Sequence, residues 1–350
     1  MSNNSQNRVR VGVVGVGIGA LHIEGYKMSP NAEVVAVADI NVERAKNCAE
    51  RFGIPRVYAD YQEMLAQCDL DAVSVCTPNS FHAPVAVAAF QAGCHVLCEK
   101  PISVSAAEGQ KMVDAGKASG KIFMMGFNNR FRGDTQVLKA MIDRGELGEI
   151  YYAKTGWLRR RGIPGFGGWF TTKSLSGGGP MIDLGVHVLD LALYLMGNPK
   201  PVAALGSSYA KFGPNQPGKQ DFAPAAAGGT YDVEDLAAGL VKFANGATVF
   251  VEASWASNVE SERIYTSLMG TKGGADLGPL RVYTEKDGVQ VDMTPHCPNV
   301  NGHNAEVLHF VDCIVNGTQP IATGEHGLDV IKILDAIYQS ADSGEMVQIS

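Results

Sequence analysis

The chain has 350 residues, 45% of them hydrophobic and 19% charged, which is typical of a globular protein long enough for two domains. Its formal net charge of −7 argues against nucleic acid or an anionic membrane as the main partner. No apolar run reaches the roughly 18 residues of a membrane-spanning helix, and the polar first ten residues lack the apolar core of a signal peptide. The seven cysteines form no C-x-x-C pair, so we expect reduced thiols in a cytoplasmic protein.

The first forty residues follow the order strand, glycine turn, helix, strand and acidic residue. Val9, Val11, Val13 and Val14 form a short β-branched run that leads into the turn, and an apolar run over residues 34–38 ends at Asp39. Gly15 permits a tight turn, and Gly17 lets the backbone approach a pyrophosphate at the N-terminus of the following helix. The Asp39 carboxylate can accept hydrogen bonds from ribose hydroxyls. We therefore predict dinucleotide contacts from Gly15, Gly17, Ile18, Gly19, Asp39 and Ile40.

Asp39 also favours NAD over NADP, because a carboxylate would repel a 2′-phosphate. Ile40 and Asn41 follow it, and the nearest arginine, Arg44, is expected on the next helix. The predicted cofactor is therefore NAD, with NADP as the second choice.

Residues 1–125 alternate between strand and helix patterns. The later strands are expected near residues 57–58, 72–76, 95–98 and 122–125, and the later helices near residues 42–51, 61–66, 84–92 and 106–119. Such alternation predicts an α/β Rossmann domain with a doubly wound parallel sheet. Ligands of these sheets bind beyond the carboxyl ends of the strands.

Residues 126–350 show a different pattern and are predicted to form a second domain. Helices are expected near residues 135–144 and 181–196, and strands near residues 150–157, 202–212, 236–243 and 248–256. Asn245-Gly246 and Asp287-Gly288 are hairpin signals. This predicts an α+β domain with a large, mainly antiparallel open sheet. Because few helices are available to cover it, we expect a homodimer or homotetramer.

Two long loops interrupt the second domain, and each is expected to have its own character. The loop over residues 158–180 carries three consecutive arginines and two adjacent aromatic residues, which favours a substrate loop. The segment over residues 213–230 is rich in Pro, Gly, Ala and Gln, and we expect it to be a mobile excursion.

Asp183, His187 and Asp190 have the i, i+4 and i+7 spacing that places side chains on one face of a helix. A carboxylate beside a histidine fixes its tautomer and favours a general base for an alcohol. The alternative is a histidine that only satisfies its helix neighbours. A metal site would need a further ligand that the sequence does not place, so no metal is predicted.

Lys100 directly follows a predicted strand and precedes Pro101, which places its ammonium at the ligand edge of the sheet. There it can hold a substrate hydroxyl and stabilise negative charge on its oxygen. The alternative is a surface lysine paired with Glu99.

Together these motifs resemble the Gfo/Idh/MocA oxidoreductase family over essentially the whole chain. The motifs are Gly15-Val16-Gly17, Thr77-Pro78-Asn79 with His82, Glu99-Lys100-Pro101, and Gly177-Gly178-Gly179 leading to Asp183 and His187. One departure is the stretch from Gly17 to His22, which is shorter than in many members. The resemblance implies a Rossmann domain, an open sheet used for oligomerisation, and a lysine–proline peptide that is often cis.

The resemblance also implies the roles of individual residues. Lys100, Asp183 and His187 form the implied catalytic set. Further cofactor contacts are implied for Thr77, Pro78, Asn79, His82, Glu99, Lys100 and Trp169. The implied substrate contacts are Lys100, Arg159, Arg160, Trp169, Asp183, His187 and His303. For Trp169 a core position, and for the arginines a solvated basic loop, remain open.

The predicted function is NAD-dependent oxidation of a secondary hydroxyl of a sugar or cyclitol, by hydride transfer. The substrate can be an inositol, a pyranose, an anhydrosugar or a glycoside. Alternatives are a sugar oxidoreductase that retains its cofactor, a redox-assisted glycosidase, and an NAD sensor without turnover.

Overall fold

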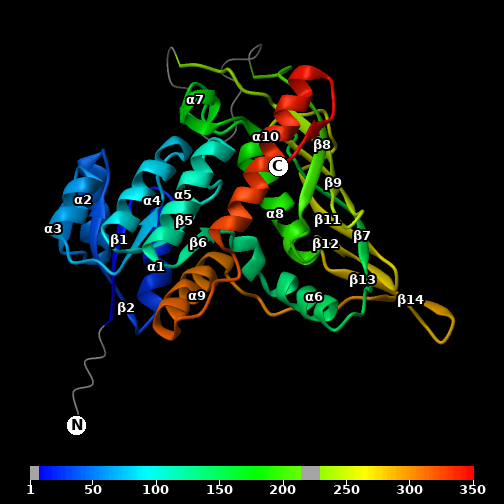
Figure 1. Cartoon of the computed structure of the whole chain (residues 1–350), viewed down its shortest axis with the longest axis horizontal. Coiled ribbons are helices and arrows are strands. Elements are labelled where there is room, and N and C mark those ends of the chain that lie inside the picture. The colour runs from blue at the N-terminus through cyan, green and yellow to red at the C-terminus, as the bar shows by residue number, and fades with distance from the viewer. Residues whose placement is uncertain (1–7, 214–228) are drawn as a thin grey trace, which may run out of the picture. The chain divides into compact units, whose positions relative to one another are not determined.

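The computed structural model describes residues 8–213 and 229–350, which form two compact units (Figure 1). The first unit comprises the described residues up to Ser103 together with Ala107–Phe131 and Val300–Leu328. The second comprises Val104–Ala106, the described part of Arg132–Asn299, and Asp329–Ser350. The division expected at residues 125 and 126 treats each domain as one continuous segment, whereas here Val300–Leu328 packs with the first unit. Most of the excursion predicted over residues 213–230 lies outside the described residues.

The first unit is built on a six-stranded parallel sheet, as the alternating pattern predicts. Its strands are β1 (Val9–Val14), β2 (Ala32–Ala38), β3 (Arg56–Tyr58), β4 (Ala72–Val75), β5 (His95–Glu99) and β6 (Phe123–Gly126). Their spatial order is β3-β2-β1-β4-β5-β6. The order reverses between β1 and β4, and ligands of doubly wound sheets bind at such a switch point.

Six helices accompany this sheet, and capping residues mark both ends of α2. They are α1 (Gly19–Met28), α2 (Val42–Phe52), α3 (Tyr61–Gln67), α4 (His82–Gln91), α5 (Ala106–Ser119) and α9 (Gly302–Asn316). The Asn41 side chain caps the start of α2 by accepting from the Arg44 N–H, and Gly53 ends α2 with φ +68°. The helix α9 joins this unit because Val307 and Phe310 are fully buried in its core. At Gly25 of α1 an added Cβ would lie 2.8 Å from Val307, so the two helices pack closely.

The second unit contains a nine-stranded sheet in the order β14-β13-β12-β11-β7-β10-β9-β8-β15. Its strands are β7 (Ile150–Leu158), β8 (Pro201–Tyr209), β9 (Leu236–Phe243), β10 (Thr248–Ser254), β11 (Arg263–Gly270), β12 (Gly273–Leu277), β13 (Arg281–Lys286), β14 (Val289–Met293) and β15 (Val347–Gln348). Only β7 and β10 pair in parallel, so the predicted mainly antiparallel sheet is confirmed.

Both predicted hairpins are present. Asn245-Gly246 connects β9 to β10, with φ +87° at Gly246. Asp287 and Gly288 connect β13 to β14 with φ +55° and +77°, the positive values that a type I′ turn requires.

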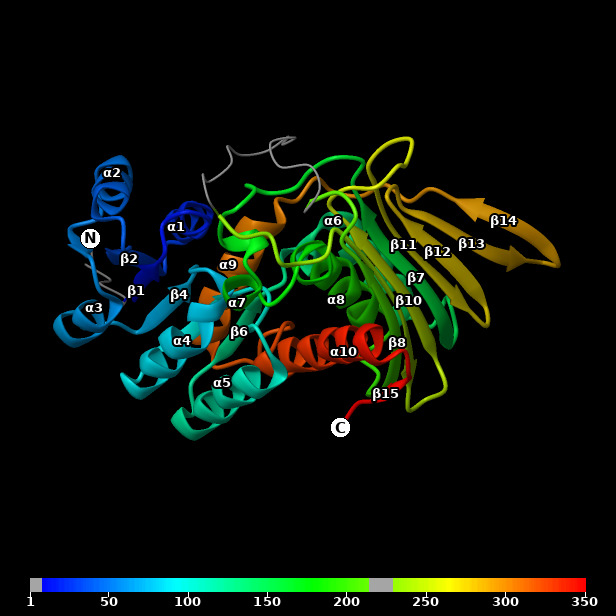
Figure 2. The ribbon, with the colours of Figure 1, turned by 90° about the horizontal axis from the view of Figure 1, so that it is seen from above.

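One face of the large sheet is covered by helices. Figure 2 shows α8 (Val186–Leu195) and α10 (Gly324–Ser343) along this face. A Cβ added to Gly239 of β9 would lie 2.6 Å from Ile337 of α10, so glycine permits this close packing. The opposite face carries exposed apolar side chains, among them Leu205 and Leu240, which are directly paired neighbours on β8 and β9. The remaining helices of the unit are α6 (Gly133–Asp143) and α7 (Lys173–Ser176).

Within residues 8–213 and 229–350, no helix is both long enough and apolar enough to cross a membrane. The seven cysteines all belong to this described part, and no two of them form a disulfide.

Candidate active site

The glycine turn between β1 and α1 has the geometry of a phosphate cradle. Gly15 has φ +87°, and a Cβ there would collide with the Cys76 carbonyl at the end of β4. Around Gly17, by contrast, an added Cβ would have no atom within 4 Å, so this side of the turn is open. No side chain caps the N-terminus of α1, although the Ala20 and Leu21 N–H groups donate to the Gly17 and Ile18 carbonyls. An uncapped helix N-terminus favours a bound anion.

Asp39 supports this turn directly, although it is only 5% exposed. Its Oδ2 accepts from the Val16 N–H at 3.0 Å, and its Oδ1 accepts from the Asn41 N–H at 2.8 Å. The guanidinium of Arg44 reaches back from α2 and donates to both oxygens at 2.8 Å. Burial raises the pKa of Asp39, but the bonds from Arg44, Val16 and Asn41 outweigh it and hold the pKa below its usual value.

Two further groups fit a dinucleotide at this edge of the sheet. The Thr77 hydroxyl, just beyond β4, is buried and has no hydrogen-bond partner in the part of the chain that the structure describes. A buried hydroxyl in this state is normally satisfied by a ligand or water. Ile40 is 92% exposed beside Asp39 and offers an apolar surface. The residues present therefore fit the predicted cofactor.

His82 does not have the position expected of a cofactor contact. It is fully buried, with Nδ1 2.7 Å from the Pro101 carbonyl oxygen and Nε2 2.8 Å from the Thr77 carbonyl oxygen. Burial lowers the pKa of His82, and the two carbonyl contacts act in the opposite direction. Both ring nitrogens are engaged within the protein, so His82 connects the end of β4 to the peptide that follows Lys100.

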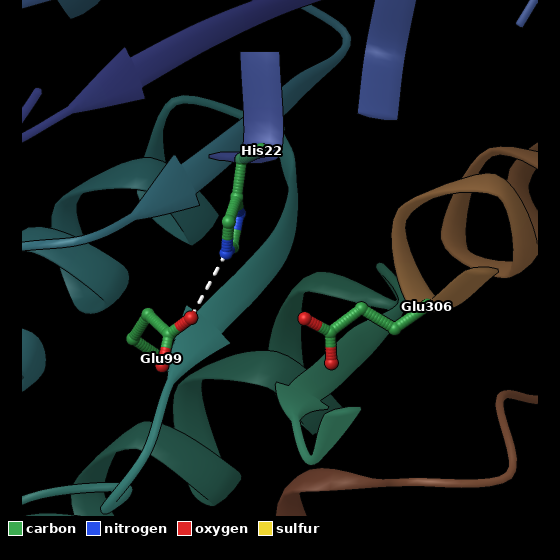
Figure 3. A group of neighbouring side chains, drawn as sticks. All are labelled: His22, Glu99 and Glu306. Carbon is green, nitrogen blue, oxygen red and sulfur yellow. Dashed lines mark hydrogen bonds and ion pairs between the residues drawn. The ribbon is translucent and has the colours of Figure 1, made fainter. Parts of the chain in front are cut away.

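Lys100 is held by its backbone, and the Lys100–Pro101 peptide is cis. The neighbouring Glu99 is 6% exposed; its Oε2 accepts from the Lys100 N–H at 3.1 Å, and its Oε1 lies 3.0 Å from His22 Nε2 (Figure 3). Burial raises the pKa of Glu99, but His22 outweighs this effect and lowers the pKa to about 2. Glu99, predicted to contact the cofactor, thus supports the Lys100 peptide.

His303, predicted to bind substrate, lies on α9 within the first unit. Its Nε2 is 3.0 Å from Nδ2 of Asn128, and its Nδ1 is 3.3 Å from Oε1 of Glu306. The side chain is 31% exposed, so part of the ring remains accessible.

In the second unit, a glycine run leads into the helix that carries Asp183 and His187. Gly177 has φ +87°, and a Cβ on Gly179 would collide with the Glu234 backbone. The buried Glu234 carboxylate accepts from the N–H groups of Gly179 and Met181 at 2.8 and 3.2 Å, and from the Tyr338 hydroxyl at 2.7 Å. Glu234, which sequence reasoning missed, therefore fixes the backbone just before Asp183.

The helix predicted over residues 181–196 is not regular. Met181–Gly185 forms a π-helical turn, and α8 begins only at Val186, so the spacing rule for an α-helix does not apply to Asp183. Within residues 181–190, only Asp183 and His187 are not buried, whereas Asp190 is 1% exposed. The Asp183 Oδ2 accepts from the indole Nε1 of the fully buried Trp255 at 3.0 Å.

The imidazole of His187 lies beside a set of groups at the end of β7. The ring of Trp157 lies 5.9 Å from the imidazole, and the Arg159 guanidinium lies over Trp157 at 5.2 Å. Glu262 joins both, because its Oε1 accepts from Trp157 Nε1 at 2.7 Å and from Arg159 Nε at 3.2 Å. Trp157 and Glu262 were not singled out by the sequence, since neither belongs to a motif.

The other predicted substrate residues of this unit lie on its surface. Arg160 is exposed and donates to the Glu260 carbonyl at 3.2 Å. Trp169 is half-buried and stacks on Phe170, with ring centroids 3.8 Å apart. Both side chains remain candidates for ligand contact.

Comparison with known proteins places these features in context. Residues 9–127 match an oxidoreductase family domain described as an NAD-binding Rossmann fold, and residues 139–349 match the C-terminal alpha/beta domain of the same family. D-glucoside 3-dehydrogenase of Escherichia coli (strain K12) is 37% identical over 347 residues, covering 97% of each chain. The scyllo-inositol 2-dehydrogenase (NAD(+)) of Bacillus subtilis (strain 168) is 31% identical over 98% of this chain and 97% of that protein. A solved levoglucosan dehydrogenase in complex with NADH and levoglucosan has a TM-score of 0.87 at 26% identity, covering 98% of this chain and 100% of that chain.

Proposed function

Because the chain belongs to the Gfo/Idh/MocA oxidoreductase family and carries its NAD-binding domain, we propose that it oxidises a secondary hydroxyl of a pyranoside. A D-glucoside oxidised at carbon 3 is the first candidate, since a relative with that name is 37% identical over 97% of both chains. One observation carries this proposal above the others. In the otherwise buried run over residues 181–190, only Asp183 and His187 are half-buried, and His187 lies beside the Trp157 ring, which can stack on a sugar.

NAD would be held by the open turn at Gly17, the uncapped start of α1 and the Asp39 carboxylate. The Thr77 hydroxyl, buried without a partner in the described structure, is available to it as well. When bound, NAD accepts the hydride from the carbon that is oxidised.

The remaining chemistry is assigned to three side chains. The imidazole of His187 removes the hydroxyl proton as a general base. The Lys100 ammonium holds a hydroxyl oxygen of the substrate and stabilises the negative charge that develops on it. Asp183 is fixed by the Trp255 indole and orients the substrate or His187.

Recognition of the sugar is assigned to the end of β7. Trp157 offers a ring for stacking, while Arg159 and Glu262 offer a donor and an acceptor for hydroxyl groups. The Arg159 side chain is 16% exposed, so its guanidinium is already oriented by Glu262 before a ligand arrives. Arg160, Trp169 and His303 complete the proposed substrate contacts.

The test is NADH formation with a panel of D-glucosides, an anhydrosugar, inositols and free aldoses, measured with NAD and then with NADP. We expect turnover with NAD, highest for one pyranoside class. Tight NAD binding without NADH release for any substrate would contradict a dehydrogenase and favour an enzyme that retains its cofactor.

We also propose that the uncovered face of the nine-stranded sheet mediates a homodimer or homotetramer. Leu205 and Leu240 are 46% and 37% exposed on adjacent strands, and a pair of apolar side chains in this position is normally covered. Light scattering should give a mass of two or four chains for the wild type. For L240D we expect a lower mass, and an unchanged mass would place the interface elsewhere.

A further inference from the structure

Beneath the Lys100 peptide, the first unit buries three ionisable side chains from three different elements. His22 comes from α1, Glu99 ends β5, and Glu306 comes from α9; they are 0%, 6% and 0% exposed. One nitrogen or oxygen from each lies within 4.8 Å of the others. Figure 3 shows the Glu306 carboxyl group directed toward His22 and Glu99. No role proposed above uses Glu306.

The hydrogen bonds of His22 and Glu99 form a consistent chain. The hydroxyls of Tyr26 and Ser74 are 2.8 Å apart, and Ser74 Oγ is 3.1 Å from His22 Nδ1. If Tyr26 donates to Ser74 and Ser74 donates to Nδ1, His22 carries its proton on Nε2 and donates it to Glu99 at 3.0 Å. Glu99 is then the anion, and it also accepts from the Lys100 N–H.

Glu306 stands outside this chain. Neither of its carboxyl oxygens has a hydrogen-bond partner in the described part of the protein, and His303 Nδ1 is 3.3 Å from Oε1 without bonding geometry. A buried carboxylate in such a place is unfavourable, because it lacks both solvent and a paired charge. The negative charge of the nearby Glu99 makes ionisation of Glu306 still less favourable.

The groups that face Glu306 do not balance its charge. Burial lowers the pKa of His22, but the contact with Glu99 outweighs burial and raises it, so any positive charge on His22 is paired with Glu99. On α9, His303 has its pKa lowered by burial. Glu99, the Tyr26 hydroxyl and the buried Cys76 thiol also lie near Glu306, and burial raises the pKa of Glu306 well above its usual value. The simplest way to remove the unpaired charge is a proton on Glu306.

We propose that Glu306 is held as a neutral carboxylic acid and is a positioning residue for Lys100, acting through Glu99. While Glu306 is neutral, His22 and the Lys100 N–H remain bonded to Glu99. An ionised Glu306 would repel Glu99 and compete for the His22 N–H, which would displace the peptide that carries the Lys100 side chain. The positioning role of Glu306 rests on the proposed function of Lys100 in hydride transfer. The charge state of Glu306 is independent of that function.

The first test reads the charge state without catalysis. Infrared spectroscopy of the wild type at neutral pH should show the carbonyl band of a protonated carboxylic acid, which E306Q lacks. D312N is the matched control, because Asp312 lies on the same helix, is exposed and accepts from Asn316, so its loss should leave the band in place. The absence of this band in the wild type would overturn the proposal. About one equivalent of bound metal, lost in E306Q, would also overturn it, since histidine and carboxylates are zinc ligands.

The second test reads the effect on Lys100. E306Q keeps a neutral group of the same shape, so its kcat should stay within about threefold of the wild type, as expected for a variant that leaves the contacts intact. E306A should lower kcat by up to about 100-fold with little change in the KM for NAD, the size expected when a catalytic group is misplaced. Wild-type kcat should fall at high pH where Glu306 ionises, and E306Q should lose that decline. A folded E306Q whose kcat is as low as that of E306A would refute the positioning role of Glu306. A wild type that forms no NADH but still shows the carbonyl band of a protonated acid would instead refute the proposed function of Lys100.

Discussion

Glu234→Ala is expected to destabilise the second unit and to slow catalysis together. The carboxylate accepts from the Gly179 and Met181 N–H groups and from the Tyr338 hydroxyl, at distances of 2.7 to 3.2 Å, and it is 7% exposed. Each buried donor left without a partner costs about 1–3 kcal/mol, so we expect a loss of about 4 kcal/mol in the free energy of unfolding. The same bonds fix the backbone that leads to Asp183, and we expect kcat to fall by about tenfold or more.

The assay for this loss is urea unfolding followed by tryptophan fluorescence. All three tryptophans of the chain, at positions 157, 169 and 255, lie in the second unit, so this signal reports that unit alone. Glu252→Ala is the matched control, because Glu252 also accepts from a tyrosine hydroxyl, that of Tyr265 at 2.6 Å, but is only half-buried. Its expected cost is about 1 kcal/mol. A Glu234→Ala loss no larger than that of Glu252→Ala would refute the reasoning.

Three further predictions concern the first unit. Asp39→Ser should weaken NAD binding by about 10–100-fold, because hydrogen bonds to a charged acceptor are lost. It should also improve NADP binding relative to NAD binding, because Arg44 is released from Asp39. Titration calorimetry measures both affinities, and an unchanged preference for NAD would contradict the prediction. His82→Ala should lower both thermal stability and kcat, because the imidazole that lies between the Thr77 and Pro101 carbonyls is lost. A change in thermal stability alone would limit His82 to a structural role. His326 has its pKa lowered to about 4 by burial and by Arg130. The unfolded chain therefore takes up a proton first as the pH falls below about 6.5, and stability should decline by about 2 kcal/mol between pH 6.5 and 4, after allowance for its partial exposure. In His326→Gln this part of the pH dependence should disappear.

Much of the first unit could be predicted because its signals are local. The glycine turn, the following helix and Asp39 lie within forty consecutive residues, and each element connects to its neighbour in a parallel sheet. The hairpins at Asn245-Gly246 and Asp287-Gly288 were predictable for the same reason, since the turn residues themselves require positive φ.

What could not be predicted depends on contacts between distant parts of the chain. Glu234 reaches Gly179 across 55 residues, and Trp255 reaches Asp183 across 72. The placement of α9 in the first unit, and with it Glu306 beside His22, follows from packing between helices at opposite ends of the sequence. No periodicity or motif encodes such pairs.

The π-helical turn at Met181–Gly185 could not be predicted for a different reason. The apolar pattern there is compatible with an ordinary helix, and the sequence holds no signal for the wider turn. The turn changes the spacing between Asp183 and His187. Asp190, which lies in the regular helix α8 with His187, is buried, whereas Asp183 and His187 are not. Irregular turns of this kind occur often at functional sites.

The central claim, that His187 serves hydride transfer to NAD, is tested most directly by single-turnover NADH formation in His187→Ala. The matched control is His296→Ala, since His296 is exposed in the same unit and has no proposed role. We predict that His187→Ala slows NADH formation by about 100-fold or more, the usual contribution of a general base, while the Kd for NADH stays unchanged. Undiminished NADH formation in His187→Ala, or a loss of NADH binding equal to the loss of rate, would contradict the account.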